Sequence, residues 1–220
     1  MRSSPVAVLL CALAVACGGP QMRSGELYPG RASAAPSMRC LPDPDVVDEA
    51  LTPRMRAGLE LAEESFAVEA PAPPGSRAAL DLTDWAQGPL REWLEQKTRT
   101  IEEARRELDL AAEETHRQRI MGGAIVGLMY EDVARVLLRV PAPEDLEDEP
   151  EILEIYQQVL ESQARPFLET SRRAYHACAL NASEPESMRH WSRFCRLRED
   201  ELPAGDGPSE DGTTVEVLVD

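Results

Sequence analysis

One helical stripe constrains the fold more than any other feature of this chain. From Leu90 to Thr115, apolar or small residues recur at alternating steps of four and three, with Lys97 filling one step. That spacing places them along a single side of an α-helix. It predicts a long amphipathic helix from Gly88 to about Arg119 in its own bundle, with a coiled-coil surface for a partner as the alternative. The stripe consists of Leu90, Leu94, Lys97, Ile101, Ala104, Leu108, Ala111 and Thr115.

A shorter helix is predicted ahead of the stripe, from Thr52 to about Phe66. Thr52 can cap it, and Pro53 suits the first helical position. Residues 42–51 can form a short helix of their own. Three prolines and a glycine in residues 68–79 then predict a surface linker.

A glycine-rich stretch follows the long helix and is expected to stay helical to about Leu138. Gly123 and Gly127 form a G-x-x-x-G step, which lets a neighbouring helix approach closely. Alternatively, Gly122 and Gly123 end the long helix and a new one begins. Charged residues interrupt the apolar run and argue against a membrane span; they are Glu131, Asp132 and Arg135.

Two more helices are predicted in the C-terminal part. One runs over residues 150–180, with a break or kink at Pro166. The other runs to about Glu199 and opens with a capping box of Ser183 and Glu186. The predicted fold is therefore all-α, with antiparallel helical hairpins forming a bundle or a short solenoid.

Charge and composition divide the chain into regions. The 220 residues carry 40 acidic and 23 basic side chains, a net charge of −17, so nucleic acid and anionic headgroups should be repelled. Residues 45–202 are expected to form the helical domain. Residues 17–44 predict a flexible tether, and the acidic residues 203–220 predict a flexible tail, in which TTVEVLVD is a weak strand candidate. The acidic, proline-bounded residues 141–150 lack the spacing of a calcium loop.

The beginning of the chain predicts export. A short positively charged start and an apolar run to Ala16 have the length of a signal peptide over residues 1–16, too short to cross a bilayer. Cleavage after Ala16 would leave Cys17 as the first residue. Plain secretion after the same cleavage and an unprocessed cytosolic chain are the alternatives.

The sequence AVAC, ending at Cys17, resembles the lipobox of bacterial lipoproteins, although Ala14 stands where that pattern has leucine. The resemblance implies that the Cys17 thiol takes a diacylglyceryl group and that the new amine is acylated, for example with palmitate. Each buried methylene contributes about 0.8 kcal/mol, so two or more chains anchor stably. The residue after the cysteine is Gly18 rather than aspartate, which favours the outer membrane and a location on the periplasmic face of the envelope.

Three cysteines remain after Cys11 leaves with the signal and Cys17 is lipidated. In an oxidising compartment two of them should pair. Cys178 and Cys195 flank a helical turn and are the favoured disulfide. Cys40 would then be a free thiol or crosslink the tether, or it replaces one of the other two in the pair.

The stretch YHACALNA…MRHWSRFCRLREDEL is similar to the C-terminal helical segment of periplasmic tetratricopeptide-type proteins of gliding myxobacteria. The matching positions are Tyr175, Cys178, Trp191, Ser192 and Cys195. No thirty-four-residue repeat is evident. The resemblance implies a divergent helical-hairpin scaffold that binds other envelope proteins.

No catalytic, cofactor or metal signature stands out in the sequence. The spacing H-x-C…H-x4-C is no standard zinc pattern, and no flanking motif supports a cysteine nucleophile with a histidine base. We expect a non-enzymatic, lipid-anchored protein that docks other envelope proteins. The alternatives are an enzyme or enzyme inhibitor with an unrecognised site, and a ligand-binding module with a cavity beside the three glycines. The H-x-C…H-x4-C residues are His176, Cys178, His190 and Cys195.

Overall fold

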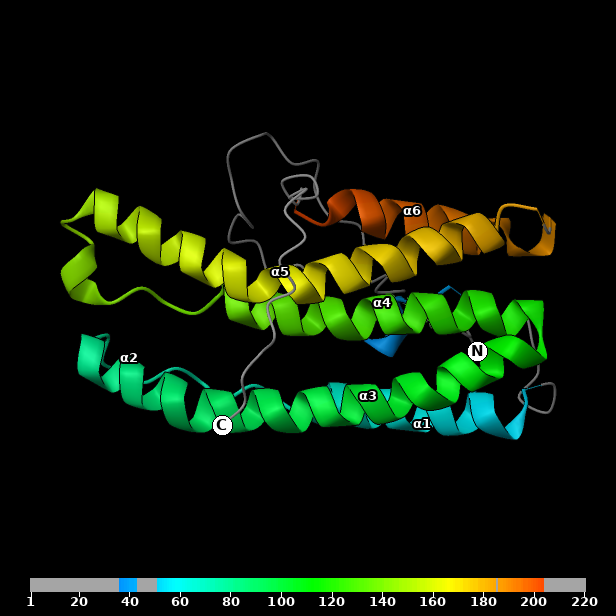
Figure 1. Ribbon diagram of the computed structural model, residues 1–220, viewed down its shortest axis with the longest axis horizontal. Coiled ribbons are helices and arrows are strands. Elements are labelled where there is room, and N and C mark those ends of the chain that lie inside the picture. Colours follow the sequence, from blue (N-terminus) through cyan, green and yellow to red (C-terminus); the bar gives the residue numbers. More distant parts are fainter. Residues whose placement is uncertain (1–35, 43–50, 185, 204–220) are drawn as a thin grey trace, which may run out of the picture. The chain divides into compact units, whose positions relative to one another are not determined.

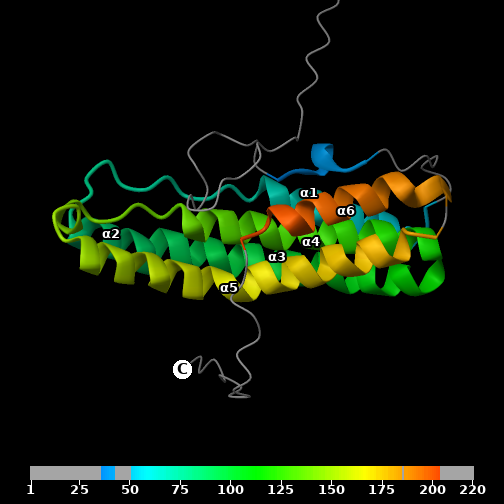
Figure 2. The ribbon, with the colours of Figure 1, turned by 90° about the horizontal axis from the view of Figure 1, so that it is seen from above.

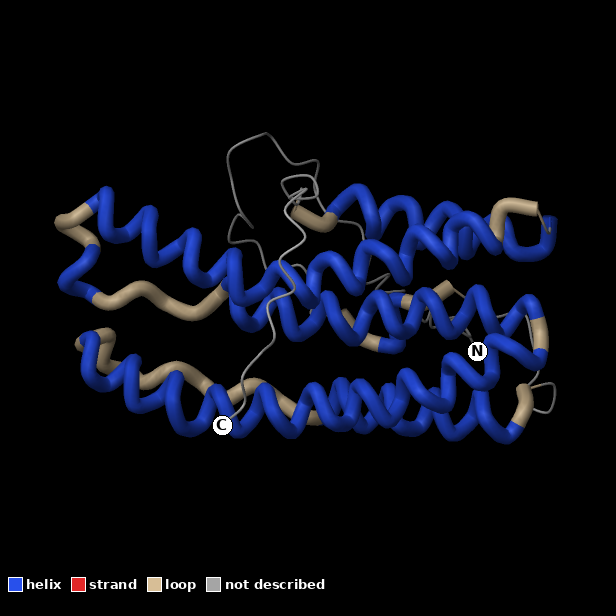
Figure 3. The backbone as a smooth tube through the Cα atoms, in the orientation of Figure 1, coloured by secondary structure: helices blue, strands red, loops and turns tan. Residues whose placement is uncertain are grey.

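The computed structural model describes residues 36–42, 51–184 and 186–203, and within them it contains helices, turns and loops but no strand (Figure 3). The prediction of an all-α fold is confirmed. The α-helices are α1 (Pro53–Ala67), α2 (Ala79–Trp85), α3 (Arg91–Glu114), α4 (His116–Leu138), α5 (Pro150–Asn181) and α6 (Arg189–Glu201). Shorter helical turns are η1 (Met38–Cys40), η3 (Ala86–Leu90), η4 (Glu144–Leu146) and η5 (Glu186–Met188).

Successive long helices pack as antiparallel neighbours and form a bundle. Helix α4 lies between α3 and α5, while α1 packs mainly on α3, and α6 on α5 (Figures 1 and 2). The core is therefore a continuous apolar cluster to which all these helices contribute.

Helix α4 is central because its sequence is apolar or small on nearly every side. Sixteen of its 23 residues are buried, which is what a helix without a polar face requires. Thr115 caps its start, accepting a hydrogen bond from the backbone nitrogen of Gln118. The predicted end at Leu138 is confirmed.

The stripe on α3 faces the interior of the bundle, as the first of its two interpretations predicted. Its buried residues include Lys97, whose side chain is 0% exposed. The Lys97 ammonium lies 2.8 Å from Asp132 Oδ2 and donates to the Ser65 carbonyl at 2.5 Å. A paired and hydrogen-bonded lysine can occupy a core position, so the charge does not interrupt the stripe.

The predicted boundaries of the long helix are wrong at both ends. Helical structure begins earlier, with α2, and a π-helical turn, η3, carries it through Pro89 into α3. It ends earlier as well, because Thr115 is extended, with φ −146° and ψ 149°. The break thus lies neither at Arg119 nor at the glycine pair. Thr115 fits the stripe and also caps the next helix, and the capping role determines the structure.

Helix α5 runs through Pro166 as one helix, so the predicted break is wrong, whereas Figure 1 shows α5 bending near its middle, in agreement with the kink that was the other predicted outcome. Proline removes one backbone donor from a helix interior. The buried residues Ala164 and Leu168 flank it and keep the segment packed against the bundle.

The predicted capping box before the last helix is wrong too. The Ser183 hydroxyl donates to the Leu180 carbonyl at 2.6 Å, as expected of a serine that closes the preceding helix. The short turn η5 follows, and α6 begins only at Arg189.

Several predictions concern residues outside the described ranges. They are the signal peptide, lipidation at Cys17, the tether up to residue 35, the short helix within residues 42–51, the tail and its strand candidate. The end of the predicted tether is described and differs from a flexible segment, because it forms η1 and packs Met38 and Leu41 against the core. Within the described ranges, none of the helices combines the length and the apolar character needed to cross a membrane.

Candidate functional site

The close approach of α5 to α4 depends on two glycines, as the G-x-x-x-G step predicts. A Cβ atom on Gly123 would lie 3.2 Å from the Ala174 carbonyl oxygen, and one on Gly127 would lie 2.6 Å from the Tyr175 ring. Gly122 faces α3 instead, at ordinary contact distance from Leu108. Neighbouring helices therefore occupy the space beside all three glycines.

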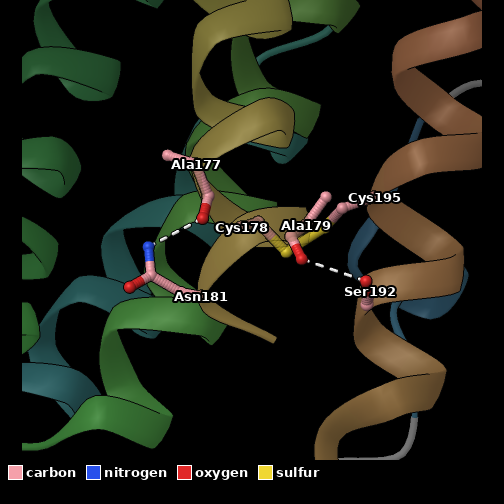
Figure 4. The surroundings of a disulfide bond; sticks show 6 residues. All are labelled: Ala177, Cys178, Ala179, Asn181, Ser192 and Cys195. Carbon is pink, nitrogen blue, oxygen red and sulfur yellow. Dashed lines mark hydrogen bonds between the residues drawn. A yellow bond between two sulfur atoms is a disulfide. The ribbon is translucent and has the colours of Figure 1, made fainter. Parts of the chain in front are cut away.

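The predicted disulfide between Cys178 and Cys195 is confirmed and joins α5 to α6, with a Cα–Cα distance of 6.1 Å (Figure 4). Beside it, the Ser192 hydroxyl donates to the Ala179 carbonyl at 3.0 Å. Cys40 is a free, half-buried thiol. The hairpin of α5 and α6 is thus closed covalently and by a buried hydrogen bond.

A buried charge network that joins α4 to this hairpin was not predicted. Glu131 on α4 accepts from Arg135 at 3.0 Å, from Arg198 on α6 at 2.5 Å and from the Tyr175 hydroxyl on α5 at 2.8 Å. The side chains of Glu131, Arg135 and Arg198 are 3%, 7% and 5% exposed. The available signal was Glu131 and Arg135, four residues apart on an otherwise apolar helix.

The electrostatics of this network favour a protonated Tyr175 hydroxyl and a charged Arg198 guanidinium. Burial raises the pKa of Tyr175 well above its ordinary value, and the Glu131 charge raises it further. Burial alone would lower the pKa of Arg198, but the Glu131 charge and the Tyr175 hydroxyl reverse that and raise it. Tyr175 therefore stays a neutral donor beside a carboxylate that joins three helices.

The outer face of α6 has a different character. A hollow of about 460 Å³ lies along it. No ion pair joins Arg193 or Arg196 to another residue in the described part of the chain. The hollow is lined by Ser183, Arg189, Ser192, Arg193, Arg196, Leu197 and Asp200.

The N-terminal half of α5 exposes an apolar face. Ile152, Ile155 and Val159 are 43%, 58% and 52% exposed, and they follow one another at steps of three and four. Tyr156 borders this stripe and is partly buried, and its hydroxyl donates to the Pro141 carbonyl at 2.9 Å.

Acidic residues surround this exposed apolar face of α5. Residues 140–164 contain no lysine, arginine or histidine. Arg77, from the linker before α2, lies 2.6 Å from Glu147 and neutralises one carboxylate. The segment carries Glu144, Asp145, Glu147, Asp148, Glu149, Glu151, Glu154 and Glu161.

The residues considered for chemistry do not form a reactive centre. Both Cys178 and Cys195 are oxidised, so neither offers a thiolate to a metal or a substrate. His176 Nδ1 lies 3.0 Å from Glu199, and His116 Nε2 lies 2.9 Å from the Asn181 carbonyl oxygen. No group of three or more metal-binding side chains comes together in the described part of the chain.

Two surface features thus stand apart from the buried core, the exposed apolar face of α5 and the arginine-lined hollow on α6. The first combines exposed apolar side chains with uncompensated negative charge, and the second is basic. Neither protein-family models nor curated proteins nor solved structures provide a match to this chain.

Proposed function

We propose that the chain is a lipid-anchored cell-envelope protein whose helical domain is a non-enzymatic scaffold that docks other envelope proteins. The observation that supports docking is the exposed apolar face of α5, formed by Ile152, Ile155 and Val159, which we call the docking face. The sequence of residues 1–17 supports the envelope location.

The docking face differs from the rest of the bundle in the exposure of its large aliphatic side chains. The bundle buries its large aliphatic residues almost throughout, in a core that includes Ile101, Ile120 and Leu128 at 0% exposure. Three neighbouring aliphatic side chains left half exposed at helical spacing match the anchors by which a helix packs on a partner. Contiguous apolar exposure of this kind is characteristic of interaction sites.

Anchoring rests on Cys17. Two acyl signals already hold a protein stably on a bilayer, and the lipobox implies three chains. The partners are then the lipid bilayer, through the acyl chains, and envelope proteins, through α5.

The anchor is tested by labelling cells with a palmitate precursor. The wild-type protein should carry the label and partition with membranes, whereas Cys17→Ser should lose both. A mature wild-type protein that mass spectrometry shows to have an unmodified Cys17 thiol would reject the anchor.

Docking is tested by crosslinking in intact envelopes with two matched variants. Ile155→Glu places a charge on the docking face, and Leu197→Glu places the same charge on α6, where Leu197 is 46% exposed. Crosslinks to other envelope proteins should disappear in the first variant and persist in the second. Equal crosslinking of both variants would contradict a docking role for α5.

A further inference from the structure

We propose that the occupant of the docking face is a cationic amphipathic helix of a partner protein. This inference rests on the proposed function and adds the chemistry of the partner.

The geometry of the face suits a helix. Ile152 and Val159 are seven residues apart, so the face is about 10 Å long, two helical turns. Anchors at positions i, i+3 and i+7 are those that one helix presents to another. Tyr156 borders this stripe, and its hydroxyl is already used in a hydrogen bond to the Pro141 carbonyl. The exposed aliphatic side chains of the docking face are therefore the anchors that a partner would meet.

The negative charge around the docking face favours a partner helix with positive charge. Glu151 and Glu154, on α5 itself, are exposed and make no ion pair within the described ranges. Arg77 pairs with one carboxylate only, so the segment keeps most of its eight negative charges. Lysines or arginines beside the apolar stripe of a partner would meet these carboxylates, which speeds association and selects against acidic partners.

The same charge argues against other occupants. A second copy that laid its own docking face on this one would bring two acidic segments together at short distance, and like charges there oppose association. A bilayer with anionic headgroups is repelled for the same reason. An acidic or neutral apolar helix would gain the apolar contact but lose the electrostatic one.

A designed peptide tests the inference directly. The probe is a fluorescent 18-residue helix of leucine and lysine with all leucines on one face, and binding to the full chain is followed by anisotropy. Two control peptides are one with glutamate in place of lysine and one with the same composition in scrambled order. The wild-type protein should bind the Leu–Lys helix at least tenfold more tightly than either control.

Two pairs of variants separate the contributions of the face and its charge. Ile155→Glu should weaken binding about tenfold, as loss of a central apolar anchor does, while Leu197→Glu should leave it unchanged. Glu151→Gln/Glu154→Gln should weaken it about threefold at low salt and less at high salt, whereas Arg193→Gln/Arg196→Gln should not weaken it.

Several results would overturn the inference. They are equal binding of the scrambled peptide, tighter binding of the acidic peptide, and binding that Ile155→Glu leaves intact. Sedimentation that shows self-association of the wild type, abolished by Ile155→Glu, would make a second copy the occupant. If envelope crosslinks require Ile155 but the Leu–Lys helix does not bind, docking stands and the cationic class is wrong. If crosslinks ignore Ile155, the proposed function itself fails.

Discussion

The two halves of α5 differ in burial. Its buried residues all lie at or beyond residue 164, and its first fourteen residues contribute none. Helix α4 ends at Leu138, and Figure 1 shows α5 continuing past that end. The C-terminal half has a partner helix on each side, whereas the N-terminal half has mainly a loop. The buried residues are Ala164, Leu168, Ser171, Tyr175, Cys178 and Ala179.

Under the proposed function, this difference would separate stability from recognition along a single helix. Around Tyr175 and Cys178, a disulfide, a four-membered charge network and two close glycine contacts join α4, α5 and α6. Around Ile155 the structure shows one hydrogen bond to the loop and a row of exposed carbons. Substitutions in the first region should therefore change folding, and those in the second should change binding alone.

The largest loss should come from Glu131→Gln. The neutral amide would leave the buried guanidinium groups of Arg135 and Arg198 without their shared carboxylate, and breaking such a pair costs about 3–5 kcal/mol. The free energy of unfolding, from urea titration, should fall by that amount. Glu154→Gln on the exposed half is the control and should change it by less than about 0.5 kcal/mol. Equal effects of the two substitutions would contradict the division.

Removal of the disulfide should have the next largest effect. Cys178 and Cys195 are 17 residues apart, and freeing a loop of that size costs about 3 kcal/mol in the chain-entropy model. Cys178→Ser/Cys195→Ser should lower the unfolding free energy by this amount. The wild-type protein measured in reductant should show the same unfolding free energy as the variant. Cys40→Ser, at the free thiol, is the control and should change little.

The sequence predicted what depends on local pattern. Periodicity placed the helices α1, α3, α4 and α5 near their observed positions, and redox chemistry with spacing identified the pair Cys178 and Cys195. The glycine step predicted the close contact of Gly123 and Gly127 with another helix, although not which one.

Features that depend on tertiary partners were missed. Thr115 satisfies both a stripe position and a cap, and only the packing of two antiparallel helices decides between them. Glu131 is the centre of a buried network only because Arg198 and Tyr175, 67 and 44 residues away in the sequence, donate hydrogen bonds to it. The docking face looked like one side of an ordinary amphipathic helix, because the sequence does not show which turns of α5 extend past the end of α4.

A pair of glycine substitutions on α4 should have opposite signs. Gly127→Ala would place a Cβ atom 2.6 Å from the Tyr175 ring, which is fully buried and bonded to Glu131, so overpacking should cost about 1–3 kcal/mol. Gly122→Ala meets only an ordinary contact at 3.5 Å and removes the helix penalty of glycine, a gain of up to about 1 kcal/mol. Thermal unfolding of both variants measures this, and two changes of equal sign would be inconsistent with the contact to α5.

Alkaline pH should weaken the buried region through Tyr175. Its pKa is raised in the folded chain, so the unfolded chain gives up this proton near pH 10 while the folded chain keeps it. The contribution is complete below pH 10 and declines as pH rises, by about 1.4 kcal/mol at pH 11. Urea titrations should show that the free energy of unfolding falls between pH 8 and pH 11 by about this much more in the wild type than in Tyr175→Phe. Parallel drops would mean that Tyr175 ionises in the folded protein.

The smallest effect on folding should come from the docking face itself. Ile155 is 58% exposed, so Ile155→Glu removes little buried area and should change the unfolding free energy by no more than about 0.5 kcal/mol. Circular dichroism and urea titration measure this on the variant used for crosslinking. A loss above about 2 kcal/mol would mean that the exposed half of α5 contributes to the core after all, and that lost crosslinks report unfolding. If Ile155→Glu changes the unfolding free energy only slightly but loses the crosslinks, the exposed half of α5 contributes to binding and not to stability.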